Sequence, residues 1–298
     1  MGDFTVAAVI PAYNGELVLR DCIESLLRQT RDVSRIYVVD NASSDGTERV
    51  VRDFHAGRVE YTRLAQNIGP TGGFATGMQF AVRDGHHWLW LMDQDGRAEP
   101  DSVEKLLNGA SADEKILAAA PAKYDSTGSP WVAENGDGVG VPLERYLGTE
   151  TFDIDETMWS GMLVRASAVH LVGLPLVELF GWWCDGEYCS RLRRYGRVVV
   201  VPQARICHHR TGAVHMDFST YWKHYYYQRN SMYLYRKGLM RGPGSARMFL
   251  SICRQLGYIT LRQDHKVQRL RILLTAVAHA LAGRMGRGPA WLQGSGNL

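Results

Sequence analysis

Short apolar runs alternate with segments of helical periodicity along the first third of the chain. Four runs have the length and composition of buried strands: Val6–Ile10, Arg35–Val39, Val59–Leu64 and Trp88–Met92. Three segments between or after them place apolar residues at helical spacing: Leu17–Leu27, Thr47–Phe54 and Gly72–Val82. Repeated strand–helix–strand units predict an α/β fold, Rossmann-like, with a mostly parallel sheet flanked by helices.

The remainder of the chain is less regular. Residues 125–155 are rich in Gly, Pro and acidic side chains, which predicts a loop or lid. Gly181–Tyr195 predicts a turn that enters a helix, and Val198–Val201 predicts a further strand. The pattern then becomes helical and basic. We therefore expect an α/β domain over residues 1–235 and a basic helical extension over residues 236–298.

Polar loops follow three of the predicted strands at their carboxyl ends. These loops are Pro11–Asn14, Asp40–Ser44 and Asp93–Gly96. Ligands of open α/β sheets bind just outside the carboxyl ends of the strands. We therefore expect the three loops to form one binding site.

Asp93 and Asp95 stand one residue apart, directly after the fourth strand. Two carboxylates in one turn can converge on a hard divalent cation, because such cations prefer oxygen ligands. Mg²⁺ or Mn²⁺ bound there would also bridge to phosphate oxygens. The alternative is an ordinary solvated turn, and the position at the strand end favours the metal site.

Two other loops suggest a nucleotide. Asp40 is placed to accept hydrogen bonds from a base or ribose, although Ser44–Thr47 also has the composition of a helix cap. The Gly-rich segment Asn67–Phe74 leads into a helix, where glycines allow a ligand to approach the backbone and the helix N-terminus favours anions. This segment is neither a Walker loop nor a dinucleotide-binding pattern.

The composition excludes several classes of protein. With 45% hydrophobic and 22% charged residues, the chain is neither disordered nor of low complexity. No run of about 18 apolar residues predicts a transmembrane span, and the N-terminus lacks the regions of a signal peptide. Five scattered cysteines without a CxxC pair predict neither a disulfide framework nor a zinc cage. We expect a cytoplasmic protein.

Charge is strongly polarised along the chain. Residues 1–189 carry 15 basic and 29 acidic side chains, a net charge of −14. Residues 190–298 carry 19 basic and 2 acidic side chains, a net charge of +17. The C-terminal third should therefore attract an anionic partner, which could be nucleic acid, a membrane surface or a diphosphate.

Several motifs occur in a fixed order along residues 5–240. Those of the first third are Val9–Asn14, Val38–Thr47, Asn67–Gly69 and Asp93–Asp95. Together they resemble glycosyltransferase family 2. Further segments are similar to its bacterial rhamnosyltransferase and galactofuranosyltransferase branches: Trp159–Gly161, Phe180–Arg191 and Tyr225–Asn230.

The resemblance implies an inverting glycosyltransferase of the GT-A fold that uses a nucleoside diphosphate sugar, with residues 1–235 as its catalytic domain. Asp93 and Asp95 would hold Mg²⁺ or Mn²⁺, joined by His208, with His209 as the alternative ligand. The residues implied to bind the donor nucleotide are Pro11, Ala12, Tyr13, Asn14, Asp40, Asn67, Gly72, Asp93 and Arg229. Arg229 would contact the diphosphate bidentately, or else lie on the surface of an amphipathic helix.

Inverting transfer requires a general base that takes the proton of the acceptor hydroxyl. The resemblance places this base in the segment Trp182–Tyr188. We predict Asp185, with Glu187 as the second candidate, because two nearby carboxylates raise the pKa of one of them. Asp185 could at the same time cap the helix that follows.

The acceptor is expected to contact Trp159, Ser160, Gly161, Trp182 and Trp183. The two adjacent tryptophans would stack on a sugar ring or, alternatively, belong to the core. The motifs resemble those of galactofuranosyltransferases and of rhamnosyltransferases, so the resemblance implies either UDP-galactofuranose or dTDP-rhamnose as the sugar donor. The resemblance implies a glycan or polyprenyl-diphosphate-linked glycolipid as acceptor, in the synthesis of cell-envelope polysaccharide.

The basic C-terminal region contains one apolar helix flanked by arginines, Leu270–Leu281. It is too short to span a bilayer but suits an interfacial helix at the inner face of the plasma membrane. The alternative is a helix packed on the catalytic domain. Two further hypotheses are a nucleic-acid-binding protein, for which no signature motif is present, and a non-catalytic nucleotide-sugar sensor. We expect no nucleic-acid partner.

Overall fold

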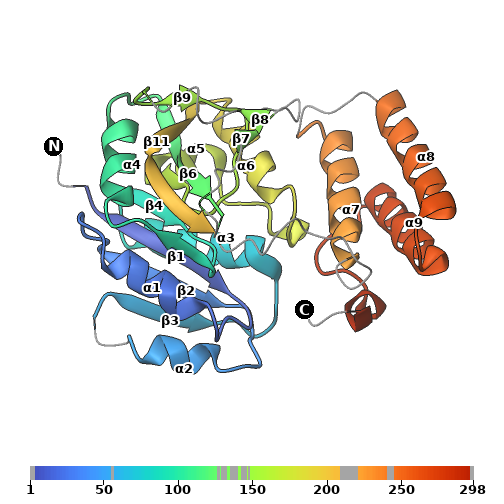
Figure 1. Cartoon of the computed structure of the whole chain (residues 1–298), viewed down its shortest axis with the longest axis horizontal. Helices are drawn as coiled ribbons and strands as arrows, with labels where there is room; N and C mark the ends of the chain where they lie inside the picture. Colours follow the sequence, from blue (N-terminus) through green and yellow to red (C-terminus); the bar gives the residue numbers. More distant parts are fainter. Residues whose placement is uncertain are drawn as a thin grey trace.

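A computed structural model describes residues 4–54, 57–125, 128, 133–134, 140–141, 146, 148–208, 221–239 and 245–295. Its centre is a nine-stranded sheet with the order β3-β2-β1-β4-β10-β6-β11-β5, and β9 pairs with β11 (Figure 1). The N-terminal strands are β1 (Val6–Ala12), β2 (Arg35–Asp40), β3 (Val59–Arg63) and β4 (Trp88–Leu91). The later strands are β5 (Gly96–Ala98), β6 (Ile116–Tyr124), β9 (Phe152–Asp153), β10 (Leu163–Arg165) and β11 (Arg197–His208).

The sheet is parallel in its N-terminal half and mixed in the other half. Strands β1 to β4 pair in parallel, as predicted. The short strand β10 enters antiparallel between β4 and β6, and β5 lies antiparallel to β11. The predicted α/β sheet is therefore confirmed, but it is mixed, because β10 reverses direction at the centre.

Nine helices accompany the strands within the described residues. They are α1 (Leu19–Leu27), α2 (Thr47–Arg52), α3 (Gly69–Arg83), α4 (Ser102–Ser111), α5 (Ala166–Val172), α6 (Cys184–Leu192), α7 (Trp222–Arg236), α8 (Ser245–Arg262) and α9 (Lys266–Ala282). Two 3₁₀ turns, Val177–Leu179 and Ala290–Ser295, and a small hairpin of β7 (Ala133–Glu134) and β8 (Gly140–Val141) complete the description. The predicted loop of residues 125–155 otherwise lies largely outside the described residues.

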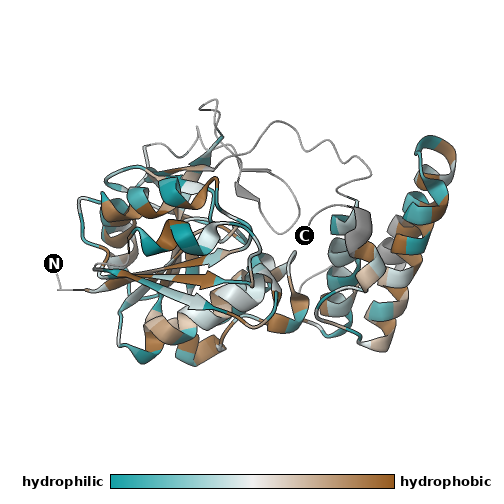
Figure 2. Ribbon diagram, turned by 90° about the horizontal axis from the view of Figure 1, so that it is seen from below, coloured by the Kyte–Doolittle hydropathy of each residue, from teal (hydrophilic) through white to brown (hydrophobic). Residues whose placement is uncertain are grey.

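Two apolar clusters cover the two faces of the sheet. Successive side chains of a strand point to opposite faces, so Ala8 joins the cluster under α1, α2 and α4, while Val9 joins the cluster under α3, α5 and α6. On β4, Trp90 likewise joins the first cluster and Leu91 joins the second. Figure 2 shows the strands of the sheet between helices that carry both hydrophilic and hydrophobic residues.

Helix α3 begins three residues earlier than predicted and includes the glycines of the Gly-rich segment. A Cβ atom on Gly77 would lie 2.3 Å from Val9 Cγ1, and one on Gly73 would lie 2.7 Å from Pro11 Cβ. These glycines therefore let the helix approach strand β1 closely. Gly72 is buried within α3, where a Cβ atom would meet Ile68, which does not support the predicted contact with a donor nucleotide.

The C-terminal helices form a separate group beside the sheet, at the right of Figure 1. Helix α9 packs along α7, and their contact contains a third apolar cluster: Phe180, Tyr221, Tyr225, Tyr226, Ile272, Ala276 and Leu292. Phe180 belongs to the sheet domain, so this cluster joins the two parts. Among the described residues, no helix combines the length and the hydropathy that crossing a bilayer requires.

Candidate functional site

Hydrogen bonds join the loops at the carboxyl ends of β1 and β4. The side chain of Gln94 accepts a hydrogen bond from the Tyr13 backbone N–H at 2.9 Å. Its amide group donates to the Tyr13 carbonyl oxygen at 3.2 Å. The residue between Asp93 and Asp95 thus pairs with the backbone of the first loop and fixes the distance between the two loops.

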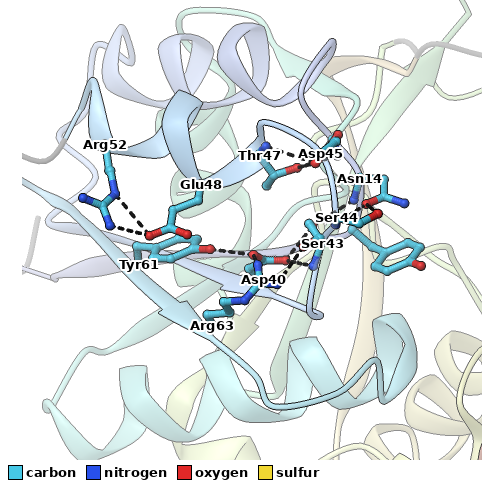
Figure 3. Close-up of polar contacts among 12 residues, drawn as sticks. Asn14, Asp40, Ser43, Ser44, Asp45, Thr47, Glu48, Arg52, Tyr61 and Arg63 are labelled. Carbon is cyan, nitrogen blue, oxygen red and sulfur yellow. Dashed lines mark hydrogen bonds and ion pairs between the residues drawn. The ribbon is translucent and has the colours of Figure 1, made fainter.

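The loops that follow β1 and β2 are joined in a similar way (Figure 3). Asn14 has a left-handed backbone, with φ of 47°, and its N–H donates to the Ser43 hydroxyl at 2.9 Å. The Ser44 N–H donates to the Asn14 side-chain oxygen at 2.8 Å. Asn14 tolerates this conformation because its short polar side chain bonds locally. All three predicted loops therefore meet at one edge of the sheet.

Asp40 lies at the centre of this arrangement but is completely buried. One carboxylate oxygen accepts hydrogen bonds from the Ser43 N–H at 2.8 Å and the Ser43 hydroxyl at 2.5 Å. The other accepts from the Tyr61 hydroxyl at 2.5 Å and from Arg63 at 2.8 Å. Because these four donors occupy the carboxylate, the structure does not support the predicted contact with a base or ribose. Asp40 instead fixes the loop of residues 41–45.

The Asp93–Gly96 turn lies over helix α1. Cys22 of α1 donates from its thiol to the Asp93 carbonyl oxygen at 3.4 Å. Burial raises the pKa of this thiol, and the negative charges of Asp95 and Asp93 raise it further. The carboxylates of Asp93 and Asp95 therefore both lie near the Cys22 thiol, at the end of β4.

These residues fit a divalent cation by the chemistry of their donor atoms. Mg²⁺ is commonly held by one or two carboxylates together with substrate phosphates, which matches the pair Asp93 and Asp95. Within the part of the chain that the structure describes, no three acidic, His or Cys side chains are arranged so that they could hold a metal ion together. The backbone of His208 pairs with Gly96, so the end of β11 lies beside this turn. The side chain of His208, and all of His209, lie outside the described residues.

Asp185 occupies the first turn of α6 and faces the same region. Burial raises the pKa of its carboxyl group, and the negative charge of Asp93 adds to the increase. Lys123 and the N–H of Gly186, which donates to Asp185 at 2.9 Å, oppose that shift. Asp93 and Asp185 are thus close enough for their charges to interact. The structure therefore brings the predicted base and the predicted metal ligand together.

Lys123 is a buried cation that sequence reasoning missed. It stands at the end of β6 and is 7% exposed. Its ammonium group donates to the Thr157 hydroxyl at 2.7 Å and to the Met158 carbonyl oxygen at 3.1 Å. Burial lowers the pKa of Lys123 to about 8, although the charges of Asp185 and Asp93 act in the opposite direction. The only signal in the sequence is a lysine at the end of an apolar strand.

Glu187 does not face the site. Its carboxylate is completely buried and forms a two-point ion pair with Arg191, at 2.6 and 2.9 Å. Arg191 also donates to the carbonyl oxygens of Val172 and Leu174. This pair ties α6 to the segment after α5, so the structure does not support Glu187 as the general base.

The segment Trp159–Gly161 precedes β10 and lies beside the Asp93 turn. The Gly161 N–H donates to the Leu91 carbonyl oxygen at 2.7 Å, and φ of Gly161 is 81°. A Cβ atom on Gly96 would lie 3.1 Å from the Ser160 hydroxyl oxygen. Among the described residues, the Ser160 hydroxyl and the indole N–H of Trp159 are buried polar groups without a hydrogen-bond partner. Ser160 is 0% and Trp159 is 4% exposed, so the structure places both residues in the interior beside this turn.

The predicted residues Trp182 and Trp183 precede α6 and pack on α7. The Trp182 ring lies 5.3 Å from Trp222 and 5.9 Å from Tyr226, centre to centre. The Trp183 indole donates to the Tyr227 carbonyl oxygen at 3.1 Å. Each tryptophan keeps part of its surface exposed. The structure thus places both between the sheet domain and the C-terminal helices.

Arg229 is completely buried rather than available to a diphosphate. Its guanidinium donates to Asn230 at 2.9 Å, to the Leu179 carbonyl oxygen at 3.0 Å and to the Gly286 carbonyl oxygen at 2.6 Å. The rings of Tyr225 and Tyr226 lie 5.1 Å away. The guanidinium of Arg229 is therefore bonded to protein groups. This burial supports neither the predicted diphosphate contact nor the alternative of a surface residue.

The glycosyl transferase family 2 model matches residues 7–169. The galactofuranosyltransferase GlfT1 of Mycobacterium tuberculosis H37Rv is 31% identical over 211 residues, which cover 64% of this chain. The chain spans 66% of the length of that relative. The dTDP-rhamnosyl transferase RfbF of Shigella flexneri is 23% identical over 293 residues, which cover 95% of this chain and 97% of that protein.

Solved structures of glycosyltransferases share the fold. The structure of Staphylococcus aureus TarS 1–349 in complex with UDP-GlcNAc has a TM-score of 0.63 at 13% identity and covers 98% of this chain and 84% of that chain. The structure of GalNAc-T7 with UDP, GalNAc and Mn²⁺ has a TM-score of 0.60 at 18% identity and covers 82% of this chain and 53% of that chain. At these identities the likeness establishes the fold.

Proposed function

Because the chain belongs to glycosyltransferase family 2 and is a glycosyltransferase of the GT-A fold, we propose that it is an inverting enzyme. It transfers a sugar from a nucleoside diphosphate sugar to a hydroxyl group of a glycan or glycolipid. The observations that carry this proposal are the three loops that meet at the carboxyl edge of the sheet and the position of Asp185, near enough to that edge for the negative charge of Asp93 to act on its carboxyl group. In this proposal the diphosphate subsite and the base are therefore neighbours.

The donor nucleotide binds at the carboxyl ends of β1 and β2 in this proposal. Residues Pro11 to Asn14 line the subsite, and Asn67 borders it. Asp40 holds the neighbouring loop in place through Ser43 rather than touching the nucleotide. Support comes from TarS and GalNAc-T7, which share the fold and whose structures contain UDP or UDP-GlcNAc.

Asp93, Asp95 and His208 would hold Mg²⁺ or Mn²⁺. When bound, such an ion supplies positive charge that stabilises the departing diphosphate. The Mn²⁺ in the GalNAc-T7 structure supports a divalent cation in this fold. The remaining work falls to the side chains of this chain, which orient the donor and move one proton.

Asp185 is the proposed general base. The acceptor oxygen forms a bond to the anomeric carbon while the bond from that carbon to the diphosphate breaks, and the hydroxyl proton passes to the Asp185 carboxylate. Its raised pKa makes it a stronger base than an exposed aspartate. The acceptor approaches along Trp159, Ser160 and Gly161, with Trp182 and Trp183 at the outer rim.

We expect galactofuranosyl or rhamnosyl transfer, because GlfT1 and RfbF are named for these two reactions. The purified protein is given UDP-galactofuranose or dTDP-rhamnose, with a lipid-linked or free glycan acceptor, and nucleotide release is measured with and without Mg²⁺ or Mn²⁺. One of the two donors should be consumed at least tenfold faster than UDP-GlcNAc. Failure to consume either donor with any metal would contradict the proposed donor class.

The test of the base is the isosteric variant Asp185→Asn. Transfer should fall by about 10²–10⁴-fold, because the amide cannot accept the proton, while donor binding measured by calorimetry should change little. Asp185 would lose its proposed role if the variant kept wild-type turnover. Glu178→Gln is a matched control. Glu178 lies in the 3₁₀ turn before α6, and the interactions described join it to neither Asp93 nor Lys123.

We further propose that helices α8 and α9 dock on an anionic membrane surface, at the cytoplasmic face, where a polyprenyl-diphosphate-linked acceptor would lie. Each helix carries large apolar side chains that are exposed, and we call these the hairpin face: Leu250, Tyr258, Leu261, Val267, Leu274 and Leu281. Residues 245–295 contain eight Lys or Arg and one acidic residue, Asp264. The shared positive charge disfavours a second copy of this chain on the hairpin face and favours anionic lipid.

Vesicle binding tests this docking. Vesicles rich in phosphatidylglycerol should sediment the protein at 0.1 M salt, and phosphatidylcholine vesicles should not, because the attraction is electrostatic and screened by salt. Leu274→Glu should reduce binding about tenfold or more, since it places a charge at the lipid boundary. Leu171→Glu on α5 is the control, because Leu171 is exposed to a similar degree, 53% against 56%. Self-association without vesicle binding would contradict the proposal.

A further inference from the structure

We propose that Asn230 and Arg229 of helix α7 are positioning residues that hold the loop Phe180–Trp183, and through this loop the base Asp185, in the conformation that transfer requires. This inference rests on the function proposed above. In this inference, residues of helix α7 affect the rate of transfer although they do not touch the reacting groups.

The loop Phe180–Trp183 has an unusual backbone. Three of its four residues are bulky, are not glycine and have left-handed φ values: 66° for Phe180, 60° for Trp182 and 65° for Trp183. Bulky residues avoid this region, because the Cβ atom crowds the backbone there. The loop therefore keeps this shape only where neighbouring groups impose it.

Asn230 supplies that constraint from α7. Its side-chain amide nitrogen lies 2.9 Å from the Leu179 carbonyl oxygen, 2.6 Å from that of Gly181 and 2.9 Å from that of Trp182. Asn230 is completely buried. The two hydrogens of one amide group are thus shared among three backbone carbonyl oxygens of this segment.

Arg229 orients this amide. Its Nε donates to the Asn230 side-chain oxygen at 2.9 Å, which turns the amide nitrogen toward the loop. A second guanidinium nitrogen donates to the Leu179 carbonyl oxygen at 3.0 Å. The third donates to Gly286 at 2.6 Å, and the Gly286 N–H donates to the Glu178 carbonyl oxygen at 2.6 Å. The C-terminal segment therefore closes the same network.

The opposite side of the loop rests on the start of α3. The Thr71 N–H donates to the Phe180 carbonyl oxygen at 3.2 Å. A Cβ atom on Gly69 would lie 2.0 Å from that oxygen, so only glycine permits the approach. The loop is held between α3 and α7, and it continues directly into the first turn of α6. A displacement of the loop would therefore displace Asp185.

The experiment substitutes Asn230→Ala and measures transfer, donor binding and hydrogen exchange in the full-length protein. We expect the turnover number to fall about 100-fold, the effect that a misplacement of about 1 Å can have. Donor affinity should stay within about twofold, because the donor loops lie on other strands. Amides of residues 179–188 should exchange faster than in the wild-type protein.

The split between turnover and donor binding gives a readout that loss of stability alone would not move. A protein that is only destabilised loses folded molecules, so transfer and the number of donor-binding sites fall together. A displaced loop instead lowers the turnover number per donor-binding site while the donor affinity stays the same.

Gln228→Ala is the matched control. Gln228 is a buried amide on the same turn of α7, but its partner is Gln255 on α8. This variant should lose stability without a change in the turnover number per donor-binding site or in exchange at residues 179–188. Equal effects of the two substitutions on turnover and exchange would overturn the positioning role.

A second variant, Asn230→Asp, covers the case in which Asn230→Ala does not fold. An aspartate has the same shape but offers carboxylate oxygens, which repel the three carbonyl oxygens of the loop. Unchanged exchange and turnover in this variant would also overturn the inference. If the wild-type protein transfers no sugar, the proposed function fails, whereas the exchange measurement still decides whether Asn230 holds the loop.

Discussion

Individual polar side chains in this protein have roles that their residue type and position do not reveal. Asp40, Glu187 and Arg229 all belong to motifs of the family, and each is completely buried with protein partners. Burying a charge is costly unless it is paired and hydrogen-bonded. These residues therefore hold loops and helices in place, whereas Asp185, the proposed base, keeps part of its surface exposed.

Lys123 is the buried charge with the clearest consequence for pH. Its folded-state pKa is about 8, below the usual 10.5. Between these values the unfolded chain binds more protons than the folded chain, so this residue makes stability rise as the pH rises from 8 to 10.5.

The variant Lys123→Met tests this dependence. Over that pH range the wild-type free energy of unfolding should gain up to about 3 kcal/mol relative to the variant, because each pKa unit corresponds to about 1.4 kcal/mol. Urea unfolding of both proteins at pH 8 and pH 10 measures the difference. A difference that stays constant with pH would show that Lys123 titrates normally.

Two helices of this fold contain an interior glycine, a residue with low helix propensity. Gly77 lies inside α3, where glycine ordinarily weakens a helix, but a Cβ atom there would lie 2.3 Å from Val9 Cγ1. Gly257 lies inside α8 with no heavy atom within 4 Å of the position of a Cβ atom. An alanine side chain therefore fits at position 257 but not at position 77.

We predict opposite effects of the two substitutions. Gly77→Ala should destabilise the protein by about 1–3 kcal/mol, because it overpacks the contact between α3 and β1. Gly257→Ala should stabilise it by about 0.5–1 kcal/mol through helix propensity. Thermal unfolding followed by circular dichroism measures both changes. Stabilisation by Gly77→Ala would show that α3 can move away from β1 without loss.

At the scale of the whole molecule, the C-terminal region is joined to the sheet domain rather than appended to it. Gly286 accepts from Arg229, the Gly288 N–H donates to the Tyr226 hydroxyl at 2.8 Å, and Leu292 packs in the same cluster. The regions on the two sides of the proposed boundary after residue 235 therefore share a core cluster and hydrogen bonds.

A fragment of residues 1–235 should consequently be unstable. It would expose the aromatic cluster around Tyr225 and leave the buried Arg229 without Gly286. We expect a loss of more than about 3 kcal/mol, since an unsatisfied buried charged group alone costs 1–3 kcal/mol or more. Denaturant unfolding of the fragment and of the full chain tests this. Equal stability of the two would mean that the C-terminal contacts contribute little.

The amino-acid sequence determined the parallel half of the sheet, the order of its helices and the three loops at its edge. These features are local: strands β1 to β4 are apolar runs, and turn residues end them. Asp93 and Asp95 could be proposed from the same information, because they directly follow a strand, whereas Asp185 is proposed from the family resemblance. The antiparallel entry of β10 could not, since a three-residue strand carries almost no periodicity.

Tertiary structure decided how deeply each charged residue is buried and which protein groups it bonds. Burial and hydrogen-bond partners depend on segments far apart in the chain: Lys123 meets Thr157, Arg229 meets Leu179 and Gly286, and Asp40 meets Tyr61 and Arg63. A linear pattern records the residue type but not its neighbours in space. For that reason the sequence indicated the edge of the sheet at which we propose that transfer takes place, and only the fold showed which charged residues there are enclosed by protein partners.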